Sequence, residues 1–466
     1  MVAILFIGGI VALVWSVLAL RHGGMLTGCL AVIFVGSCFG HAFFHVSVGP
    51  LPITFDRLML AGLLVVFAVS YRTSLVDAKP LALADWALGS LLLVLTISTL
   101  THDWQIDGSQ PAATLLFFYG LPMAIYWLAR QAQLDRHHLH LLLGFFAVFG
   151  LYLACTAIAE KQQIWSLVFP RYIASLDHEE FFGRGRGPFL NPIGCGLYMT
   201  CGLVSWLFAW PHLQRFGRAA ILASAAVIVV GIYCTLTRSV WLGMGLGIVL
   251  VTGLSVPKSW RVPLFVSLAI AGTSLLAIMG SSLSSFKRDK HVSVHEMRES
   301  TKLRPILATV AWRMFQDRPF LGHGFGQYKQ IDMDYLRDPT SNLPLEKARP
   351  YVQHNVFLAL LTETGLVGLT LYLTMMGLWT RSAWQVWSCS RRSLAERQMG
   401  LLMLVILASH VSNGMFHDVS IIAMSNMLLF LIAGVCQGVA GRPVTSTCER
   451  FTPSSDARAA QPALSQ

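Results

Sequence analysis

Charged residues are scarce in this chain of 466 residues: only 12% are Asp, Glu, Lys or Arg, whereas 55% are hydrophobic. An ordinary soluble domain carries about 25% charged residues, so the composition excludes that class. Apolar runs recur along the chain at about 20 residues, the length that a helix needs to cross a membrane. Open strands would leave backbone groups unsatisfied in lipid, whereas helices satisfy their own. The sequence therefore predicts an all-α polytopic transmembrane helical bundle of about 12–13 spans.

The apolar runs give thirteen candidate spans, and soft boundaries among the first three leave twelve as the alternative. We expect them at 2–20, 25–45, 55–71, 83–100, 112–129, 138–159, 188–210, 218–235, 239–255, 262–282, 355–381, 398–413 and 418–440. The first segment lacks a basic start and a cleavage site, so we expect it to stay in the membrane.

The predicted organisation has four parts. N-terminal helices occupy 1–282, a large periplasmic loop 283–353, and C-terminal helices 354–440. The tail 441–466, rich in Ser, Pro, Ala and Thr, is predicted to be a disordered cytoplasmic end.

Patterns for metals, disulfides and nucleotides are also weak. The nine cysteines have no metal-ligand spacing, and we interpret them as apolar packing residues. Gly322, Gly324 and Gly326 superficially resemble a dinucleotide loop, but no strand precedes them and no helix follows in a βαβ unit. Asp332 and Asp334 resemble a metal-binding pair, yet the loop faces away from cytosolic nucleotide sugars. We expect these two to be solvated surface acids.

Positive charge is distributed unevenly over the loops. Alternate short loops and the tail hold 16 of the 34 Lys and Arg residues, whereas the short loops between them hold only Arg57 and Arg238. This is a positive-inside pattern. The large loop holds twelve further basic residues. Without a soluble basic domain, nucleic-acid binding is a poor interpretation, and an anionic substrate on the outer side would account for the excess.

The large loop contains one predicted amphipathic helix over 301–317. Ser300 or Thr301 would cap it, and Pro305 would lie in its first turn, where a missing amide hydrogen does little harm. Apolar residues recur at three- and four-residue spacing, as on one face of a helix: Leu303, Ile306, Leu307, Val310 and Met314.

His354 is the best candidate for chemistry. It lies at the water edge of a predicted span, directly after the large loop, where a lipid-borne substrate and water both have access. Histidine titrates near neutrality and therefore suits a general base. The alternative is an interfacial histidine that caps the following helix. Asn355 would either orient His354 or cap that helix.

Four separated segments together resemble the O-antigen ligase superfamily, which also includes polysaccharide polymerases. They are GRGRGPFLNPIGCGLYM at 183–199, LTRSVWLG at 236–243, AWRMFQDRPFLGHGFGQY at 311–328 and QHNVFLALLTETGLVG at 353–368. Their order and spacing match as well, because His354, ten intervening residues and Gly365 repeat the signature at the end of the family's large periplasmic loop. The resemblance covers roughly 180–440.

The resemblance implies a transferase in a bacterial inner membrane that serves lipopolysaccharide or polysaccharide biosynthesis. Family members move a glycan from an undecaprenyl diphosphate carrier to a glycan or lipid acceptor on the periplasmic face, without a metal, nucleotide or other cofactor. We expect inversion at the anomeric carbon. A polysaccharide polymerase is the alternative within the superfamily, and a flippase or transporter of lipid-linked saccharide is the alternative from another class. A transporter should show internal repeats, whereas the long asymmetric loop favours an enzyme.

The same scheme needs cations for the leaving diphosphate, and arginine binds two phosphate oxygens at once. We place Arg184, Arg186, Arg238 and Arg318 there. The alternative for Arg238, and for one of Arg184 and Arg186, is to snorkel to lipid headgroups. The alternative for Arg318 is to pair with Asp317.

Glu363 and Gly365 are predicted supporting residues, together with Asn355. Nine positions separate Glu363 from His354, and a rotation of about 900° leaves them on opposite faces of a continuous helix. They can share one site only if the helix breaks. A structural role for Glu363, bonding to a neighbouring helix, is favoured. His417 and Asp418 remain unassigned, because they could tune a base or simply end a span.

Overall fold

The computed structural model describes residues 2–48, 51–104, 110–178, 180–257, 259–267, 269–270, 273–274, 294–336, 343–349 and 351–443. Its helices are α1 (Val2–Phe39), α2 (Phe55–Arg72), α3 (Leu83–Leu100), α4 (Pro111–Leu115), α5 (Leu121–Gln131), α6 (Arg136–Gln162), α7 (Pro192–Ala209), α8 (Arg215–Cys234), α9 (Arg238–Ser255), α11 (Val294–Asp317), α12 (Tyr328–Leu336), α13 (Val356–Ser388), α14 (Leu394–Gly414) and α15 (Ala423–Ala440). The π-helical turn η1 (Leu116–Gly120) joins α4 to α5. Short 3₁₀ turns are η2 (Trp165–Leu167), η3 (Arg171–Ala174), η4 (Gly187–Phe189), η5 (Trp210–His212), η6 (Leu345–Ala348) and η7 (Val419–Ile421).

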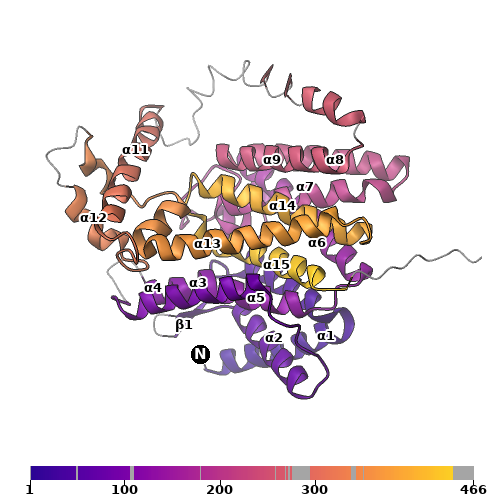
Figure 1. Ribbon diagram of the computed structural model, residues 1–466. Coiled ribbons are helices and arrows are strands. Elements are labelled where there is room, and N and C mark those ends of the chain that lie inside the picture. The colour runs from indigo at the N-terminus through magenta and orange to yellow at the C-terminus, as the bar shows by residue number, and fades with distance from the viewer. Residues whose placement is uncertain are drawn as a thin grey trace, which may run out of the picture.

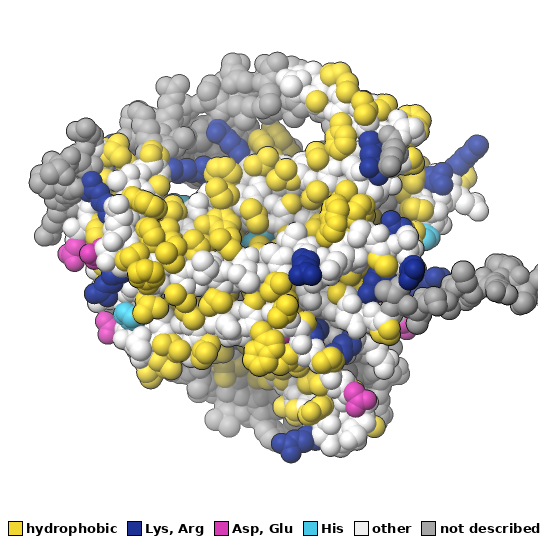
Figure 2. All heavy atoms as spheres, in the orientation of Figure 1, with side chains coloured by type: hydrophobic (Ala, Val, Ile, Leu, Met, Phe, Trp, Pro, Cys, Tyr) yellow, Lys and Arg dark blue, Asp and Glu magenta, His cyan; other side chains and the backbone are white. Residues whose placement is uncertain are grey.

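Nine helices within the described residues are long and apolar enough to cross a membrane. They lie at Leu83–Leu100, Pro111–Gln131, Arg136–Gln162, Pro192–His212, Arg215–Cys234, Arg238–Ser255, Val356–Ser388, Leu394–Gly414 and Ala423–Ala440. The predicted class, a polytopic all-α membrane protein, is confirmed. Figure 1 shows the long helices packed side by side, and Figure 2 shows hydrophobic side chains over much of the visible face.

The first two predicted spans appear as one helical run, α1, with a kink at Gly24, where φ is 67°. Its second part, Gly24–Phe39, is shorter than the nine candidate spans, and α2 is not among them. A two-stranded antiparallel hairpin of β1 (Val46–Val48) and β2 (Leu51–Ile53) joins the two helices, and the sequence did not predict it. Most of the predicted span 262–282, and the tail from residue 444, lie outside the described residues.

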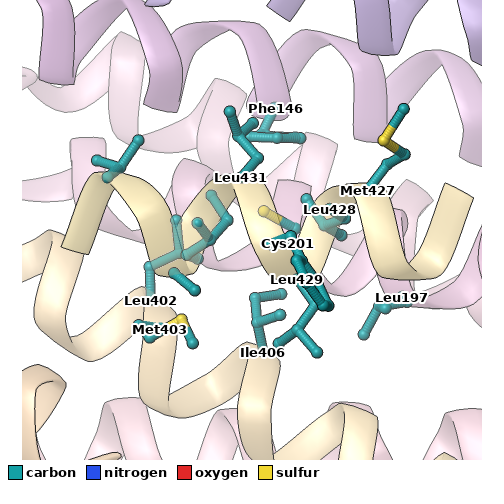
Figure 3. Packing of buried hydrophobic residues seen from close by; sticks show 14 of the residues in the cluster. Phe146, Leu197, Cys201, Leu402, Met403, Ile406, Met427, Leu428, Leu429 and Leu431 are labelled. Atoms are coloured by element: carbon teal, nitrogen blue, oxygen red, sulfur yellow. The ribbon is translucent and has the colours of Figure 1, made fainter. Parts of the chain in front are cut away.

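The centre of the bundle is formed by α6, α7, α14 and α15. Of the candidate span in α15, 83% of the residues are buried, against 22% in α8, which places α15 inside and α8 at the edge. Figure 3 shows the packing between these central helices, with Phe146, Cys201, Ile406 and Leu428 among the buried side chains. Close packing of this kind gives the loops above the bundle a rigid base.

The long loop has a small core of its own, formed by α11, α12 and η6. The five apolar residues predicted to line one helix face are all buried there, which confirms the amphipathic helix. Its predicted start is wrong, because α11 begins at Val294 and Pro305 lies inside the helix, not in the first turn. In Figure 1, α11 and α12 lie together at one end of the molecule, beside α13.

The long helix α13 is broken at Gly365, where φ is 63° and ψ is −159°. Two carbonyl oxygens left without helical donors accept from the loop that follows α11: Thr362 from the His323 amide at 3.0 Å, and Glu363 from the Gly324 amide at 2.9 Å. On the other side of the break, the amides of Leu366 and Val367 donate to the carbonyls of Pro319 and Phe320 at 2.8 and 3.2 Å. The loop thus satisfies the backbone groups that the break exposes, which is the condition for a broken helix at membrane depth.

The break turns the first segment of α13 back toward the second. The rings of Phe357 and Tyr372 have centroids 6.2 Å apart, although about 22 Å would separate these positions on a straight helix. His354 lies two residues before this first segment, next to the cap residue Asn355. Its position is therefore set jointly by the bundle and by the loop after α11.

Candidate functional site

His354 is held between two anchored neighbours. The amide nitrogen of the Gln353 side chain donates to the Thr362 hydroxyl at 2.9 Å, and that glutamine is buried. Asn355 caps α13, since its Oδ1 accepts from the amides of Phe357 and Leu358 at 2.9 and 3.1 Å. Its Nδ2 also donates to the Met415 carbonyl at 3.0 Å. Of the two roles left open for Asn355, the structure gives it the cap.

The backbone of His354 itself is left-handed, with φ at 48°. Such a conformation costs roughly 1–2 kcal/mol for a residue with a Cβ atom and is typical of functional sites. The side chain is exposed, and no hydrogen bond to its ring nitrogens is present within the described residues. Partial desolvation and the nearby charge of Arg304 lower the pKa of His354 below its usual value of 6.5. The imidazole is therefore neutral near pH 7 and able to accept a proton.

Arg304 is the residue that the sequence analysis missed. It lies on α11, and its guanidinium carbon is 5.0 Å from the ring centroid of Phe416, the residue after Met415. It forms no ion pair within the described part of the chain. Desolvation and the charge of Arg238 lower its pKa. Arg304 is thus close enough to interact electrostatically with both His354 and Arg238, and we call these three residues the cation cluster.

The elements around the cation cluster add positive potential. Arg238 is the first residue of α9, and Val356, two residues after His354, is the first of α13. A helix N-terminus carries about half a positive charge on its free amides. Two helix N-termini and two arginines therefore favour an anion here.

The segment containing Arg184 and Arg186 is buried, with the two side chains 4% and 1% exposed. The Arg186 guanidinium donates to the carbonyls of His178, Glu180 and Ile173, and its Nε lies 3.6 Å from a Glu160 oxygen. Burial lowers the pKa of Arg186. The span predicted from residue 188 starts later, because η4 occupies Gly187–Phe189 and α7 begins at Pro192.

Arg184 lies beside the turn that leads to Arg238. The amide of Gly185 donates to the carbonyl of Cys234, the last residue of α8, at 2.8 Å. The guanidinium carbon of Arg184 is 5.0 Å from the Phe181 ring centroid. This arginine is therefore buried beside that turn, with little surface of its own.

Arg318 directly follows the end of α11, whereas Arg304 lies near the middle of that helix. Fourteen residues at 1.5 Å each separate the two Cα atoms by about 21 Å. Arg318 is exposed, next to Asp317, whose carboxylate accepts a hydrogen bond from Tyr335 at 2.7 Å. The structure does not bring Arg318 to the cation cluster.

Glu363 and Gly365 support the site through the break in α13. The Glu363 carboxylate accepts from the Gly326 amide at 3.0 Å, so that it holds the glycine loop and not a neighbouring helix. A Cβ atom at Gly365 would lie 2.3 Å from the Phe320 carbonyl oxygen, which leaves room only for glycine. Since the helix breaks after Glu363, the break does not bring its side chain to His354.

Asp332 differs from the expectation of a solvated acid. It is 2% exposed, and burial raises the pKa of its carboxyl group to about 6. Asp334 is exposed, as expected. Among the described residues, no three His, Cys, Asp or Glu side chains are grouped for a metal ion.

Comparison with known proteins finds a family match for part of the chain. The model of a family described as O-antigen ligase matches residues 200–373, a range that includes Arg238, Arg304 and His354 but begins after Arg184 and Arg186. No curated protein matches the chain. The family implies a glycan ligase or polymerase in general terms, in a multi-pass membrane protein. Residues 200–373 therefore match the O-antigen ligase family, within the superfamily that the sequence motifs predicted.

Proposed function

We propose that the protein transfers a glycan from an undecaprenyl diphosphate carrier to an acceptor hydroxyl on the periplasmic face of a bacterial inner membrane. The observation that supports this most is the convergence of a neutral, exposed His354 with Arg304 and Arg238. The uneven distribution of Lys and Arg over the loops supports the orientation.

In the proposed step, the acceptor oxygen attacks the anomeric carbon of the first sugar while the bond from that carbon to the phosphate oxygen breaks. His354 takes the proton of the acceptor hydroxyl. The electron pair of the broken bond stays on the diphosphate, where Arg304 and Arg238 stabilise the added charge. A single displacement inverts the anomeric configuration.

The step uses no general acid, because the diphosphate is already a stable anion. It also has no role for a metal ion, since two guanidinium groups and two helix N-termini supply the positive charge. Arg186 is not among the proposed diphosphate contacts, because it is buried and bonded to backbone carbonyls. Arg318 is not among them either, because it lies far from Arg304. A ligase and a polymerase share this chemistry and differ in the acceptor.

The test is reconstitution of the purified protein with an undecaprenyl diphosphate glycan and candidate acceptors. His354→Ala should reduce transfer roughly 10²–10⁴-fold, the usual contribution of a general base. His212→Ala is the matched control, because His212 is exposed in η5. Full transfer by His354→Ala would refute the base, and loss of transfer with a chelator would refute the metal-independent step.

A further inference from the structure

A second polar cluster lies near the cation cluster and has no part in the proposed step. We call it the sugar cluster, and its side chains come from three elements and one cap residue: Tyr119 of η1, Glu363 and Tyr372 of α13, Ser420 of η7 and Asp418 just before η7. The Tyr119 hydroxyl is within electrostatic reach of the carboxyl groups of Asp418 and Glu363 and lies close to Ser420. Asp418 also interacts electrostatically with Tyr372.

The hydroxyl of Tyr119 is buried without a hydrogen-bond partner. The residue is 3% exposed, and its oxygen has no donor or acceptor within hydrogen-bond geometry. Buried hydroxyl groups in proteins are nearly always satisfied, so an exception calls for an explanation. Tyr119 also lies in a π-helical turn, a rare feature that is frequent at functional sites.

The two carboxyl groups each keep acceptor capacity. One oxygen of Glu363 accepts from the Gly326 amide, and one oxygen of Asp418 accepts from the amide and the hydroxyl of Ser420 at 3.1 and 2.5 Å. Each of the two oxygens of a carboxyl group can accept a hydrogen bond in either protonation state, so both groups retain free lone pairs. Neither forms an ion pair within the described residues, and both remain partly accessible.

The hydrogen-bonding groups of the sugar cluster are complementary to the hydroxyl groups of a sugar. The cluster offers many acceptors, one unpartnered hydroxyl that can donate or accept, and no cation. A buried aromatic pair lies beside it, since the rings of Tyr119 and Phe325 have centroids 5.8 Å apart. A metal ion fits less well, because no third carboxylate, His or Cys is grouped with the two carboxyl groups in the described part of the chain.

The sugar cluster lies close to the cation cluster, where the diphosphate of the donor would bind. Eight residues of the first segment of α13 separate Asn355 from Glu363, a distance of about 12 Å along a helix. Asp418 follows two residues after Phe416, whose ring covers the guanidinium of Arg304. A glycan attached to a diphosphate at the cation cluster would therefore have its first sugars within reach of these side chains.

We propose that Tyr119, Glu363 and Asp418 form a subsite for the hydroxyl groups of the donor glycan, next to the cation cluster that binds its diphosphate. The inference rests on the proposed function and adds a contact to the sugar itself. Tyr119 gains the hydrogen-bond partner that the protein alone does not provide.

The test measures equilibrium binding of two carriers to the full-length protein in nanodiscs: undecaprenyl diphosphate with and without its glycan. Tyr119→Phe should weaken binding of the glycan-bearing carrier about threefold to tenfold, the effect of one hydrogen bond, and leave the sugar-free carrier unaffected. Asp418→Asn should act in the same direction. Tyr71→Phe is the control, because Tyr71 is 53% exposed at the end of α2.

The outcome separates this inference from the proposed function. Arg304→Gln should weaken binding of both carriers, and wild-type binding by that variant would refute the diphosphate site. The sugar subsite is refuted if Tyr119→Phe and Asp418→Asn bind the glycan-bearing carrier as tightly as the wild type does. It is also refuted if both variants bind the two carriers more weakly by the same factor.

Thermal unfolding without ligand provides a second measurement. Removing an unpartnered hydroxyl should leave the midpoint of Tyr119→Phe unchanged or raise it, and the glycan-bearing carrier should stabilise this variant less than the wild type. A lower midpoint without ligand would show a structural role and overturn the assignment.

Discussion

Arg186 and Arg304 are both arginines outside the candidate membrane spans, yet they have opposite environments. Arg186 is 1% exposed and donates to three backbone carbonyls beside Glu160. Arg304 is exposed on α11, contacts an aromatic ring and has no ion-pair partner within the described residues. The guanidinium that already has protein partners stabilises the fold, whereas the one without them is available to a phosphate. Residue type alone does not distinguish these roles.

The largest expected effect is on stability, and it tests the structural role of Arg186. Arg186→Met should lower the free energy of unfolding by about 3–5 kcal/mol, because it leaves Glu160 buried without its partner. The midpoint of unfolding in detergent measures this. Combining Arg186→Met with Glu160→Met should recover part of the loss. A stable Arg186→Met protein that no longer transfers glycan would reverse the assignment.

The next effect concerns catalysis. Arg304→Gln should reduce kcat/KM roughly 10²–10³-fold, as expected for loss of one group that stabilises developing charge, while the unfolding midpoint stays near that of the wild type. Arg318→Gln is the matched control, since this exposed arginine lies about 21 Å away along the same helix. Equal losses of activity in both variants would contradict a local cation cluster.

A smaller effect tests whether the break in α13 positions His354. Gly365→Ala should destabilise the protein by about 1–3 kcal/mol and reduce transfer, because a Cβ atom would contact the Phe320 carbonyl and φ is 63°. Gly377→Ala on the same helix meets nothing within 4 Å and should gain up to about 1 kcal/mol. Thermal unfolding and transfer rates report both outcomes. Wild-type transfer by a stable Gly365→Ala protein would exclude the positioning role.

The spans could be predicted from the sequence because hydropathy is a local property. Nine predicted spans correspond to helices of sufficient length and apolarity, and the kink at Gly24 coincides with a predicted boundary. The apolar face of α11 was equally visible from its spacing. Its first turn was not, because Ser300 and Pro305 resemble a helix start although the helix already begins at Val294.

The site was only partly predictable, since it depends on contacts between distant residues. His354 and Arg238 were indicated by their positions at the ends of predicted spans, but Arg304 lies between Leu303 and Ile306, where the apolar spacing is the stronger pattern. The burial of Arg186 depends on Glu160 and on the carbonyls of a separate loop. A charge directly beside an apolar helix face is the signal that could have identified Arg304.

The smallest expected effect is also the most direct test of the central claim, that His354 and Arg304 act in one site. The base is neutral imidazole, so transfer should increase as pH rises through the pKa of His354, which lies below 6.5 because of desolvation and Arg304, and should then level off. A pH–rate profile of Arg304→Gln should show that inflection at higher pH than the wild type, because a positive neighbour has been removed. Arg318→Gln should leave it unchanged. An inflection that does not move in Arg304→Gln, or that moves to lower pH, would contradict the account.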